Sequence, residues 1–477
     1  MTDTPRKAHP RPPSVERLIQ AARERVDGRD REAVVAAARE VIGGERSRLE
    51  TGALASKVDA LAVELADRLE AWDGAATSAL VPAINATGVL LHTNLGRARW
   101  PRAAIEAAAR AAARPSLLEL DRTTGARGRR FRIAEEHVIA LTGAGDALFA
   151  NNNAAAVALA VGLAGRGGRV AVSRGELVEI GGGVRIPEIV RRAGARLVEV
   201  GTTNRTRVED FEAVLADGTA RLVLRVHPSN FVQEGFVESP DPAAVTELAH
   251  RHGAIVVDDL GSGAFLDTAA FGLAHEVTPR ERLAAGADLV TFSGDKLVGG
   301  PQVGIIAGRA DLIARLRRDP LARAVRPDKV LLAAIAATLA LYRAGVAARD
   351  IPVWRQLAIS LDELEQRTHA VLARVTRAGE PVLQVAEIES TLGGGSLPGQ
   401  TLPSRGIRVM TPSPHGLLAA LRAGDPAVVG RIERDAVTLD LRAVDPDEDA
   451  GLAAALDAAL AGTAGVSRSR GAAASHN

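Results

Sequence analysis

Hydrophobic and polar positions follow two different rhythms along the chain. Between Ser14 and about Trp72, apolar residues recur every three or four positions and charged residues fill the other face, which predicts amphipathic helices. From about Ile84, short β-branched runs alternate with helical segments. The expected strands are ALFAN (147–151), RVAVS (169–173), RLVEV (196–200), RLVLRV (221–226), AIVVDD (254–259), DLVTF (288–292) and VGIIAG (303–308). Strands that are apolar on both faces predict an α/β fold with a mostly parallel sheet covered by helices.

This pattern also predicts the domain organisation. A long helical run near residue 330 leads into a smaller α+β unit, whose expected strands are 383–390, 406–410 and 436–444. Both ends of the chain are poor in bulky apolar residues, which is typical of disorder. We therefore expect a disordered leader (1–13), a helical N-terminal domain (14–75), a large domain (84–335), a small C-terminal domain (336–462) and a disordered tail (463–477).

Composition narrows the class of protein. Of the 477 residues, 47% are hydrophobic and 25% are charged, which is typical of a water-soluble globular protein. The absence of cysteine excludes disulfides, thiolate catalysis and zinc–thiolate sites. No apolar run is long enough for a membrane span, and the N-terminal segment lacks the apolar stretch of a secretory signal. A cytoplasmic location is expected, and a net charge of +1 gives no global sign of nucleic-acid binding.

Lysine is unusually rare. Only Lys7, Lys57, Lys296 and Lys329 are lysines among 59 basic residues, so 55 are arginine. A lysine retained in such a chain is a candidate for chemistry that arginine cannot perform, and only a primary amine with a movable pKa forms an imine. Lys7 lies in the expected leader and Lys57 on an amphipathic helix, which makes both incidental. Lys329 follows a helical approach and is expected to serve structure.

Three motifs of the large domain together predict a cofactor site. In SGDK, Ser293 and Lys296 directly follow an expected strand, at the sheet edge where ligands bind. Ser293 could hold a phosphate while the Lys296 amine meets an aldehyde, although an isolated SxxK is usually a surface turn. In NNNAAAV (151–157), a strand turns into a helix whose free N–H groups would bind phosphate through Asn152, Asn153 and Ala154; alone, this motif is only a helix cap.

The third motif, VVDDLGSG (256–263), ends another expected strand. A carboxylate buried there requires a partner, and a pyridinium nitrogen would be kept protonated by it, which makes the ring an electron sink. Asp258 is the favoured carboxylate and Asp259 remains open, while an aspartate capping a turn is the simpler explanation. The three motifs together predict pyridoxal phosphate bound covalently to Lys296.

The combination resembles the fold-type-I pyridoxal-phosphate enzymes, and specifically the bacterial selenocysteine synthases. The segments that carry this resemblance are INATGVLLHTNLGRA (84–98), TGARGRR (124–130), NNNAAAV (151–157), SRGELVEIGGGVRIPEI (173–189), VHPSNF (226–231), DDLGSG (258–263), SGDKLVGGPQVGII (293–306), RAVRPDK (323–329) and GGGSLP (393–398). The resemblance implies that Lys296 is the cofactor lysine and that anion-binding arginines correspond to Arg97, Arg130, Arg323 and Arg326.

The resemblance also implies a reaction. Serine esterified to tRNA(Sec) would lose water through an aminoacrylyl-tRNA intermediate, and selenium from selenophosphate would then add to give selenocysteinyl-tRNA(Sec). Lys296 would remove the α-proton, and His92 could assist proton transfer or simply pack. The N-terminal domain would hold the tRNA, and the chain would form a homo-oligomer, a decameric ring of dimers with active sites at subunit interfaces. Selection of tRNA(Sec) has no evident local signature, and the residue stacking on the cofactor ring is sought in residues 173–183.

The main alternative is a related lyase that acts on a small amino acid or amino sugar phosphate. Such an enzyme would share the cofactor motifs, so SGDK and NNNAAAV do not separate the two functions. The helical N-terminal domain, RGRR and RAVRPDK favour the tRNA substrate. A non-catalytic scaffold of the same fold is disfavoured because Lys296 is present.

Overall fold

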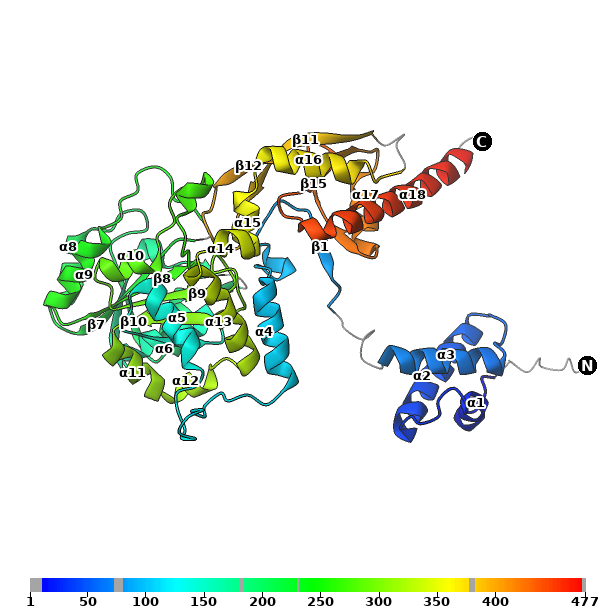
Figure 1. The fold of residues 1–477 in the computed structure, drawn as a ribbon, viewed down its shortest axis with the longest axis horizontal. Helices are drawn as coiled ribbons and strands as arrows, with labels where there is room; N and C mark the ends of the chain where they lie inside the picture. The colour runs from blue at the N-terminus through cyan, green and yellow to red at the C-terminus, as the bar shows by residue number, and fades with distance from the viewer. Residues whose placement is uncertain (1–10, 73–79, 181–182, 230, 377–381, 474–477) are drawn as a thin grey trace, which may run out of the picture. The chain divides into compact units, whose positions relative to one another are not determined.

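The structure is a computed structural model that describes residues 11–72, 80–180, 183–229, 231–376 and 382–473 (Figure 1). Its contacts divide the chain into two compact units, residues 1–82 and residues 83–477. Within the described ranges, none of the helices combines the length and the apolar character needed to cross a membrane.

The first unit is a bundle of three helices at the positions that the periodicity predicts. They are α1 (Val15–Ala22), α2 (Arg31–Glu50) and α3 (Val58–Trp72). Leu18, Val41 and Leu65 are buried in a common core. Asp30 caps α2 by accepting hydrogen bonds from the backbone N–H groups of its first turn, which would otherwise lack partners.

The second unit contains a seven-stranded sheet with the order β2-β10-β9-β8-β7-β3-β6. Its strands are β2 (Asp146–Ala150), β3 (Arg169–Ser173), β6 (Arg196–Val200), β7 (Ala220–Val226), β8 (Ile255–Gly261), β9 (Leu289–Ser293) and β10 (Gly304–Gly308). Strand β10 is antiparallel to both of its neighbours, and the other pairs are parallel. The predicted α/β class is confirmed. Each predicted strand begins and ends within two residues of the observed strand.

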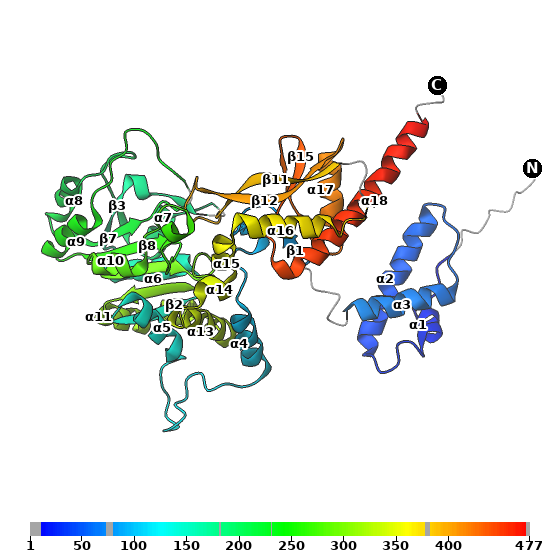
Figure 2. The same ribbon diagram turned by 45° about the horizontal axis from the view of Figure 1, so that its top comes forward.

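Helices cover both faces of this sheet (Figures 1 and 2). On one face, Leu224 and Val257 share a core with α6 (Asn153–Val161), α7 (Ile186–Arg192) and α11 (Ala310–Arg318). On the other face, Val256 packs with α8 (Val208–Leu215) and α9 (Pro242–Arg251), and Val290 with α5 (Arg132–Thr142) and α13 (Lys329–Arg343). Helix α4 (Arg102–Ala113) packs outside α13. Successive residues of a strand therefore face different helical layers.

A four-stranded antiparallel sheet with the order β11-β12-β15-β14 forms the C-terminal part (Figure 2). Its strands are β11 (Val382–Thr391), β12 (Thr401–Met410), β14 (Arg431–Glu433) and β15 (Ala436–Asp440), and its core includes residues of α16 (Leu361–Leu372), α17 (Pro414–Ala423) and α18 (Asp449–Ala473). Short strand β1 (Ala83–Asn85) pairs with β13 (Ala427–Val429).

The predicted disordered tail requires a correction, because α18 continues to Ala473. Residues 463–473 contain three alanines and no proline, so each residue keeps the backbone N–H that a helix requires. Residues 474–477 lie outside the described residues.

Short elements complete the second unit. They are β4 (Glu179–Ile180), β5 (Val184–Arg185), α10 (Pro279–Ala284), α12 (Pro320–Ala324), α14 (Ala347–Asp350), α15 (Pro352–Ala358) and the 3-10 turns Thr93–Leu95, Gly162–Ala164, Arg174–Glu176, Thr268–Phe271 and Pro446–Glu448. The parallel strands end together at one edge of the large sheet, where α/β proteins bind ligands.

Candidate active site

Lys296 lies in the turn after β9 and is buried. Among the described lysines it is the only buried one, with 8% of its surface exposed. Its Nζ donates one hydrogen bond, to the backbone oxygen of Gly395 at 3.4 Å. Burial lowers the pKa of Lys296, while the charge of Asp259 opposes this effect. The amine is therefore biased toward the neutral, nucleophilic form that imine chemistry requires.

The chain segment after Lys296 is held by buried aromatic residues. Tyr342, the only tyrosine of the chain, has its hydroxyl 3.0 Å from the carbonyl oxygen of Leu297 and 2.9 Å from that of Val298. The indole N–H of Trp354 lies 2.6 Å from the Tyr342 hydroxyl and 2.9 Å from the Leu297 oxygen. These bonds fix the backbone next to the reactive amine.

Asp259 is the carboxylate that faces Lys296. It accepts hydrogen bonds from Asn153 Nδ2 at 2.7 Å and Thr291 Oγ1 at 2.9 Å. Burial raises the pKa of Asp259, and the hydrogen bonds from Asn153 and Thr291 partly oppose the shift. A buried carboxylate held in this way can share a proton with a basic ring nitrogen.

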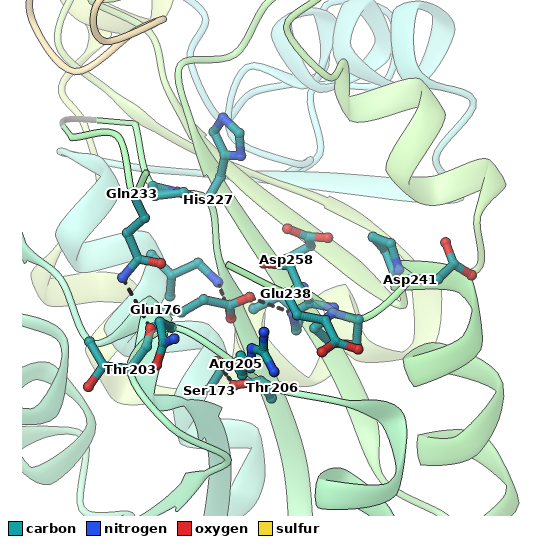
Figure 3. Close-up of a pocket in the computed structure, with 18 of the residues that line it drawn as sticks. Ser173, Glu176, Thr203, Arg205, Thr206, His227, Gln233, Glu238, Asp241 and Asp258 are labelled. Carbon is teal, nitrogen blue, oxygen red and sulfur yellow. Dashed lines mark hydrogen bonds and ion pairs between the residues drawn. The ribbon is translucent and has the colours of Figure 1, made fainter. Parts of the chain in front are cut away.

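Asp258, the favoured carboxylate in the sequence, does not line the cavity that contains Lys296, whereas Asp259 does. Side chains alternate along β8, so Asp259 faces the α6 side with Val257, whereas Asp258 faces the opposite layer with Val256. Asp258 lies 3.4 Å from Arg282 Nε and lines a second cavity (Figure 3). The sequence offered both carboxylates, but only the fold shows which face α6 covers.

The predicted phosphate site is assembled at the start of α6. Asn152 caps the helix by accepting a hydrogen bond from Ala155 N at 2.9 Å, and Asn152, Asn153 and Ala154 line the cavity that contains Lys296. Ser293 lines the same cavity from the end of β9. The side-chain amide of Asn153 binds Asp259, which does not occupy the backbone N–H group on which the phosphate prediction depends. The backbone N–H groups and the dipole of the helix remain suited to an anion.

These residues enclose a cavity of about 380 Å³, which we call the Lys296 cavity. Its lining includes several residues that the sequence did not single out: Thr93, Val178, Val184, His227, Ser229, Gln302, Gly394 and Gly395. Gly395 has a φ of +80°, and a Cβ there would lie 3.0 Å from Lys296 Nζ, so a side chain would crowd the amine. The GGGSLP motif could be recognised in the sequence, but its contact with Lys296 could not be predicted from it.

In the segment 173–183 that was sought for ring stacking, Val178 lines the Lys296 cavity, and Val184, the residue after that segment, lines it too. Residues 181 and 182 of that segment lie outside the described residues. His92 does not line the Lys296 cavity, whereas its neighbour Thr93 does. His227, at the end of β7, is the histidine in the cavity lining.

Only one of the four predicted anion-binding arginines lines the Lys296 cavity. Arg97 does so, and its Nη1 pairs with Asp295 Oδ2 at 2.7 Å. Its buried Nε has no hydrogen-bond partner within the described part of the chain. Arg97 thus retains a donor for an oxyanion.

Arg130, Arg323 and Arg326 line a different cavity of about 530 Å³, which we call the arginine cavity. Arg130 Nη1 and Arg326 Nη1 lie 3.0 and 3.3 Å from the same carboxylate oxygen of Glu119. The backbone oxygen of Val325 accepts a hydrogen bond from Asn151 N at 2.6 Å, which holds the segment beside the start of α6. Within one chain, the four predicted arginines are therefore split between two cavities.

Comparison with known proteins identifies the family. The L-seryl-tRNA selenium transferase family model matches residues 83–445. The chain belongs to the L-seryl-tRNA(Sec) selenium transferase family. It is 42% identical to the L-seryl-tRNA(Sec) selenium transferase of Rhizobium meliloti (strain 1021), over 92% of this chain and 95% of the relative. The enzyme of that name from Moorella thermoacetica is 43% identical, over 94% and 96%.

A solved structure supports the fold. The D-glucosaminate-6-phosphate ammonia-lyase structure matches with a TM-score of 0.56 and 24% sequence identity, covering 80% of this chain and 96% of that chain. At this identity the likeness concerns the fold alone. Family membership confirms the predicted pyridoxal-phosphate dependence.

The Lys296 cavity fits this cofactor. It combines a buried amine, a buried carboxylate for a ring nitrogen and a helix N-terminus with Ser293 for a phosphate. The buried Oδ1 of Asn153 has no hydrogen-bond partner among the described residues, so a polar ligand group would satisfy it.

Proposed function

We propose that the chain converts L-seryl-tRNA(Sec) and selenophosphate into L-selenocysteinyl-tRNA(Sec) and phosphate. The observation that carries the proposal is that Lys296, Asp259 and the start of α6 line the same cavity. The membership of the chain in this family supports it. The names of the relatives give seryl-tRNA(Sec) as their substrate. That selenophosphate is the selenium donor is our inference.

Pyridoxal phosphate, when bound, supplies an electron sink for negative charge at the α-carbon of the amino acid. Lys296 would anchor the cofactor covalently, and the start of α6 with Ser293 would bind its phosphate. Asp259 would hold a proton at the ring nitrogen. The Lys296 amine, once free, takes the α-proton of serine, a role that its lowered pKa favours. The β-hydroxyl would then leave with a proton as water. Water would break the Se–P bond of selenophosphate and release phosphate, the selenium would bond to the β-carbon, and Lys296 would return a proton to the α-carbon.

We propose that the selenium donor binds beside Arg97. Selenophosphate carries a phosphate-like oxyanion, and a guanidinium with a free N–H is suited to it. The arginine cavity would contribute in the predicted homo-oligomer, a decameric ring of dimers in which the active sites lie at subunit interfaces. Light scattering of the purified protein tests that assembly, and a monomer would contradict it.

The N-terminal unit is proposed to bind the tRNA, and the protein to act in the cytoplasm, where aminoacyl-tRNA is used. A gel shift with tRNA(Sec) should show binding by the full chain and weaker binding by a chain lacking residues 1–75. Equal affinity of the two forms would contradict this role for the helical unit.

The decisive test is conversion of seryl-tRNA(Sec) by the purified protein with selenophosphate, followed by mass spectrometry of the released amino acid. Selenocysteine is expected, and Lys296→Ala should yield none. Lys329→Ala is the matched control, because Lys329 Nζ binds only the carbonyl oxygen of Arg114 among the described contacts. Release of ammonia from a small amino acid or amino sugar phosphate, with seryl-tRNA left unchanged, would favour the lyase instead.

A further inference from the structure

A second cavity of about 400 Å³ lies at the carboxyl ends of β3 and β7. After β3 the chain continues to β6 at the sheet edge, whereas after β7 it continues to β8 in the opposite direction. Such a reversal opens a crevice between adjacent strands, and crevices of this kind bind ligands in α/β proteins. In Figure 3, His227 lies at one end of this cavity, and Ser173 and Thr206 lie at the other. We call it the β3–β7 cavity.

The interior charges of the β3–β7 cavity are balanced. Arg225 Nε pairs with Glu176 at 2.9 Å, and Arg282 Nε lies 3.4 Å from Asp258. Burial raises the pKa of Glu176 and that of Asp258, and the neighbouring arginines oppose both shifts. With Arg205, which lies over the Phe236 ring, the lining carries three guanidiniums. It also carries four carboxylates, Glu176, Glu238, Asp241 and Asp258, which leaves no positive excess for a phosphate.

The remaining acidic groups of the lining are turned to other partners. Glu238 pairs with Arg207 at 3.3 Å, and Asp241 caps α9 through Ala244 N at 3.0 Å. The cavity interior is thus polar but close to neutral. It differs in this respect from the arginine cavity, whose guanidiniums outnumber its carboxylates.

Several polar groups of the β3–β7 cavity lack a hydrogen-bond partner within the described residues. Arg225 Nη1 and Arg282 Nε are buried donors without an acceptor. The Asp258 carboxylate has its ion pair with Arg282 but accepts no hydrogen bond from a described residue. Unpaired buried donors are costly, so a ligand with hydroxyl groups, which both donate and accept, would complement them.

Two side-chain amides, those of Asn204 and Gln233, add hydrogen-bond acceptors to the lining of the β3–β7 cavity. The side-chain N–H groups of Asn204 and Gln233 bind the backbone oxygens of Phe236 and Thr203, at 2.8 and 3.1 Å. Both residues line the cavity, and no described hydrogen bond uses their amide oxygens, so these oxygens can act as acceptors. An exocyclic amino group of a nucleobase is a donor of matching kind.

The β3–β7 cavity adjoins the Lys296 cavity. Val226 and His227 line both, whereas the arginine cavity shares no lining residue with the Lys296 cavity. In an aminoacyl-tRNA the terminal ribose is joined directly to the carboxyl carbon of serine. If the serine amine reaches Lys296, that ribose must lie in the space next to the Lys296 cavity.

We infer that the β3–β7 cavity binds the terminal ribonucleoside of the tRNA acceptor end. Its 2′-hydroxyl, which the 3′-ester and the 5′-phosphodiester leave free, would donate to Asp258 and accept from Arg282 and Arg225. The inference rests on the proposed function, because it assumes that serine arrives as a ribose ester. The cavity would then favour a serine ester of a nucleoside over other serine esters, independently of any contact made elsewhere on the tRNA.

The test compares two serine esters on the full-length holoenzyme, serine 3′-adenosyl ester and serine methyl ester. Each is titrated while the absorbance change of the bound cofactor is followed. The adenosyl ester should reach half-saturation at a concentration at least about tenfold lower, as expected for a few added hydrogen bonds to charged groups. Asp258→Asn should remove this preference and leave the methyl ester titration within about twofold.

Asp288→Asn is the matched control. Asp288 is also buried, pairs with Arg309 at 2.9 Å, and lies beside the opposite end of the neighbouring strand β9. This variant should keep the adenosyl preference.

Equal half-saturation by the two esters in the unmodified protein would overturn the inference and leave the proposed cofactor site supported. Loss of the methyl ester response in Asp258→Asn would also overturn it, because Asp258 would then serve the Lys296 cavity. Competition by inorganic phosphate against the adenosyl ester alone would make the cavity an oxyanion site instead. A protein that responds to neither ester would overturn the proposed function, and the inference with it.

Discussion

The Lys296 cavity and the arginine cavity differ in how their cations are held. Lys296 is buried and makes one long hydrogen bond to a backbone oxygen, and its pKa is lowered. Arg130 and Arg326 instead share Glu119, whose pKa is lowered chiefly by the hydrogen bond from Arg130. A buried amine whose pKa is lowered, and which forms no ion pair closer than 4 Å with a described carboxylate, is suited to covalent chemistry. Guanidiniums grouped around a carboxylate remain charged and are prepared for anion binding. The comparison predicts that covalent chemistry takes place in the Lys296 cavity and that the arginine cavity binds an anion.

The largest effect is expected at Lys296. Lys296→Ala should abolish the cofactor absorbance near 420 nm and lower the exchange of the serine α-proton with solvent by roughly 10²–10⁴-fold, since it removes both the anchor and the base. Exchange is measured by NMR on serine methyl ester in deuterated buffer. Arg102→Ala, whose exposed side chain pairs with the exposed Glu106, is the control. A variant that still binds the cofactor at another lysine would break the assignment.

The two neighbouring aspartates should differ sharply. Asp259→Asn should lower α-proton exchange roughly 10²-fold, because the amide does not share a proton with the ring nitrogen as a carboxylate does. Asp258→Asn should remain within about threefold with the same small ester. The reverse order would place Asp258, not Asp259, on the cofactor.

The arginine cavity should affect selenium transfer without affecting α-proton exchange. Arg323→Ala is expected to raise the half-saturating selenophosphate concentration roughly tenfold, because a guanidinium contact to an oxyanion is lost. Arg349→Ala, whose side chain is exposed and pairs with Asp350, should change neither quantity. If Arg323→Ala instead impairs exchange, the two cavities do not have separate tasks.

The smallest effect concerns stability of the cofactor-free protein. The folded state lowers the pKa of Lys296 below its ordinary value of 10.5, so the unfolded chain binds more protons in the window between these two values. The contribution of Lys296 to stability is therefore unfavourable at low pH and fades as the pH rises toward 10.5. Lys296→Met should raise Tm near neutral pH by about 2 °C or more, with a smaller gain at pH 9.5. A gain independent of pH would contradict the pKa shift.

The strand pattern predicted the sheet because strands buried on both faces read as continuous apolar runs, as in RVAVS and DLVTF. Scarcity of lysine and the position of SGDK after a strand predicted Lys296 and Ser293, and both line one cavity. The choice between Asp258 and Asp259 depended on which face α6 covers, which local sequence does not encode.

Other features of the site arise from contacts between distant segments. Gly395 approaches Lys296 across 99 residues of chain, and Tyr342 binds the carbonyl of Leu297 across 45. Neither contact leaves a periodic signal in the sequence. The four anion-binding arginines were predicted from the resemblance to the family. A resemblance identifies the residues but does not show which cavity each of them lines.

The central claim is the covalent attachment of the cofactor at Lys296. The most direct measurement is borohydride reduction of the holoenzyme, followed by proteolysis and mass spectrometry. The account predicts the added mass of reduced pyridoxal phosphate on the peptide that contains Lys296, and on no peptide that contains Lys57 or Lys329. A label on one of those two lysines, or an unlabelled protein, would contradict it.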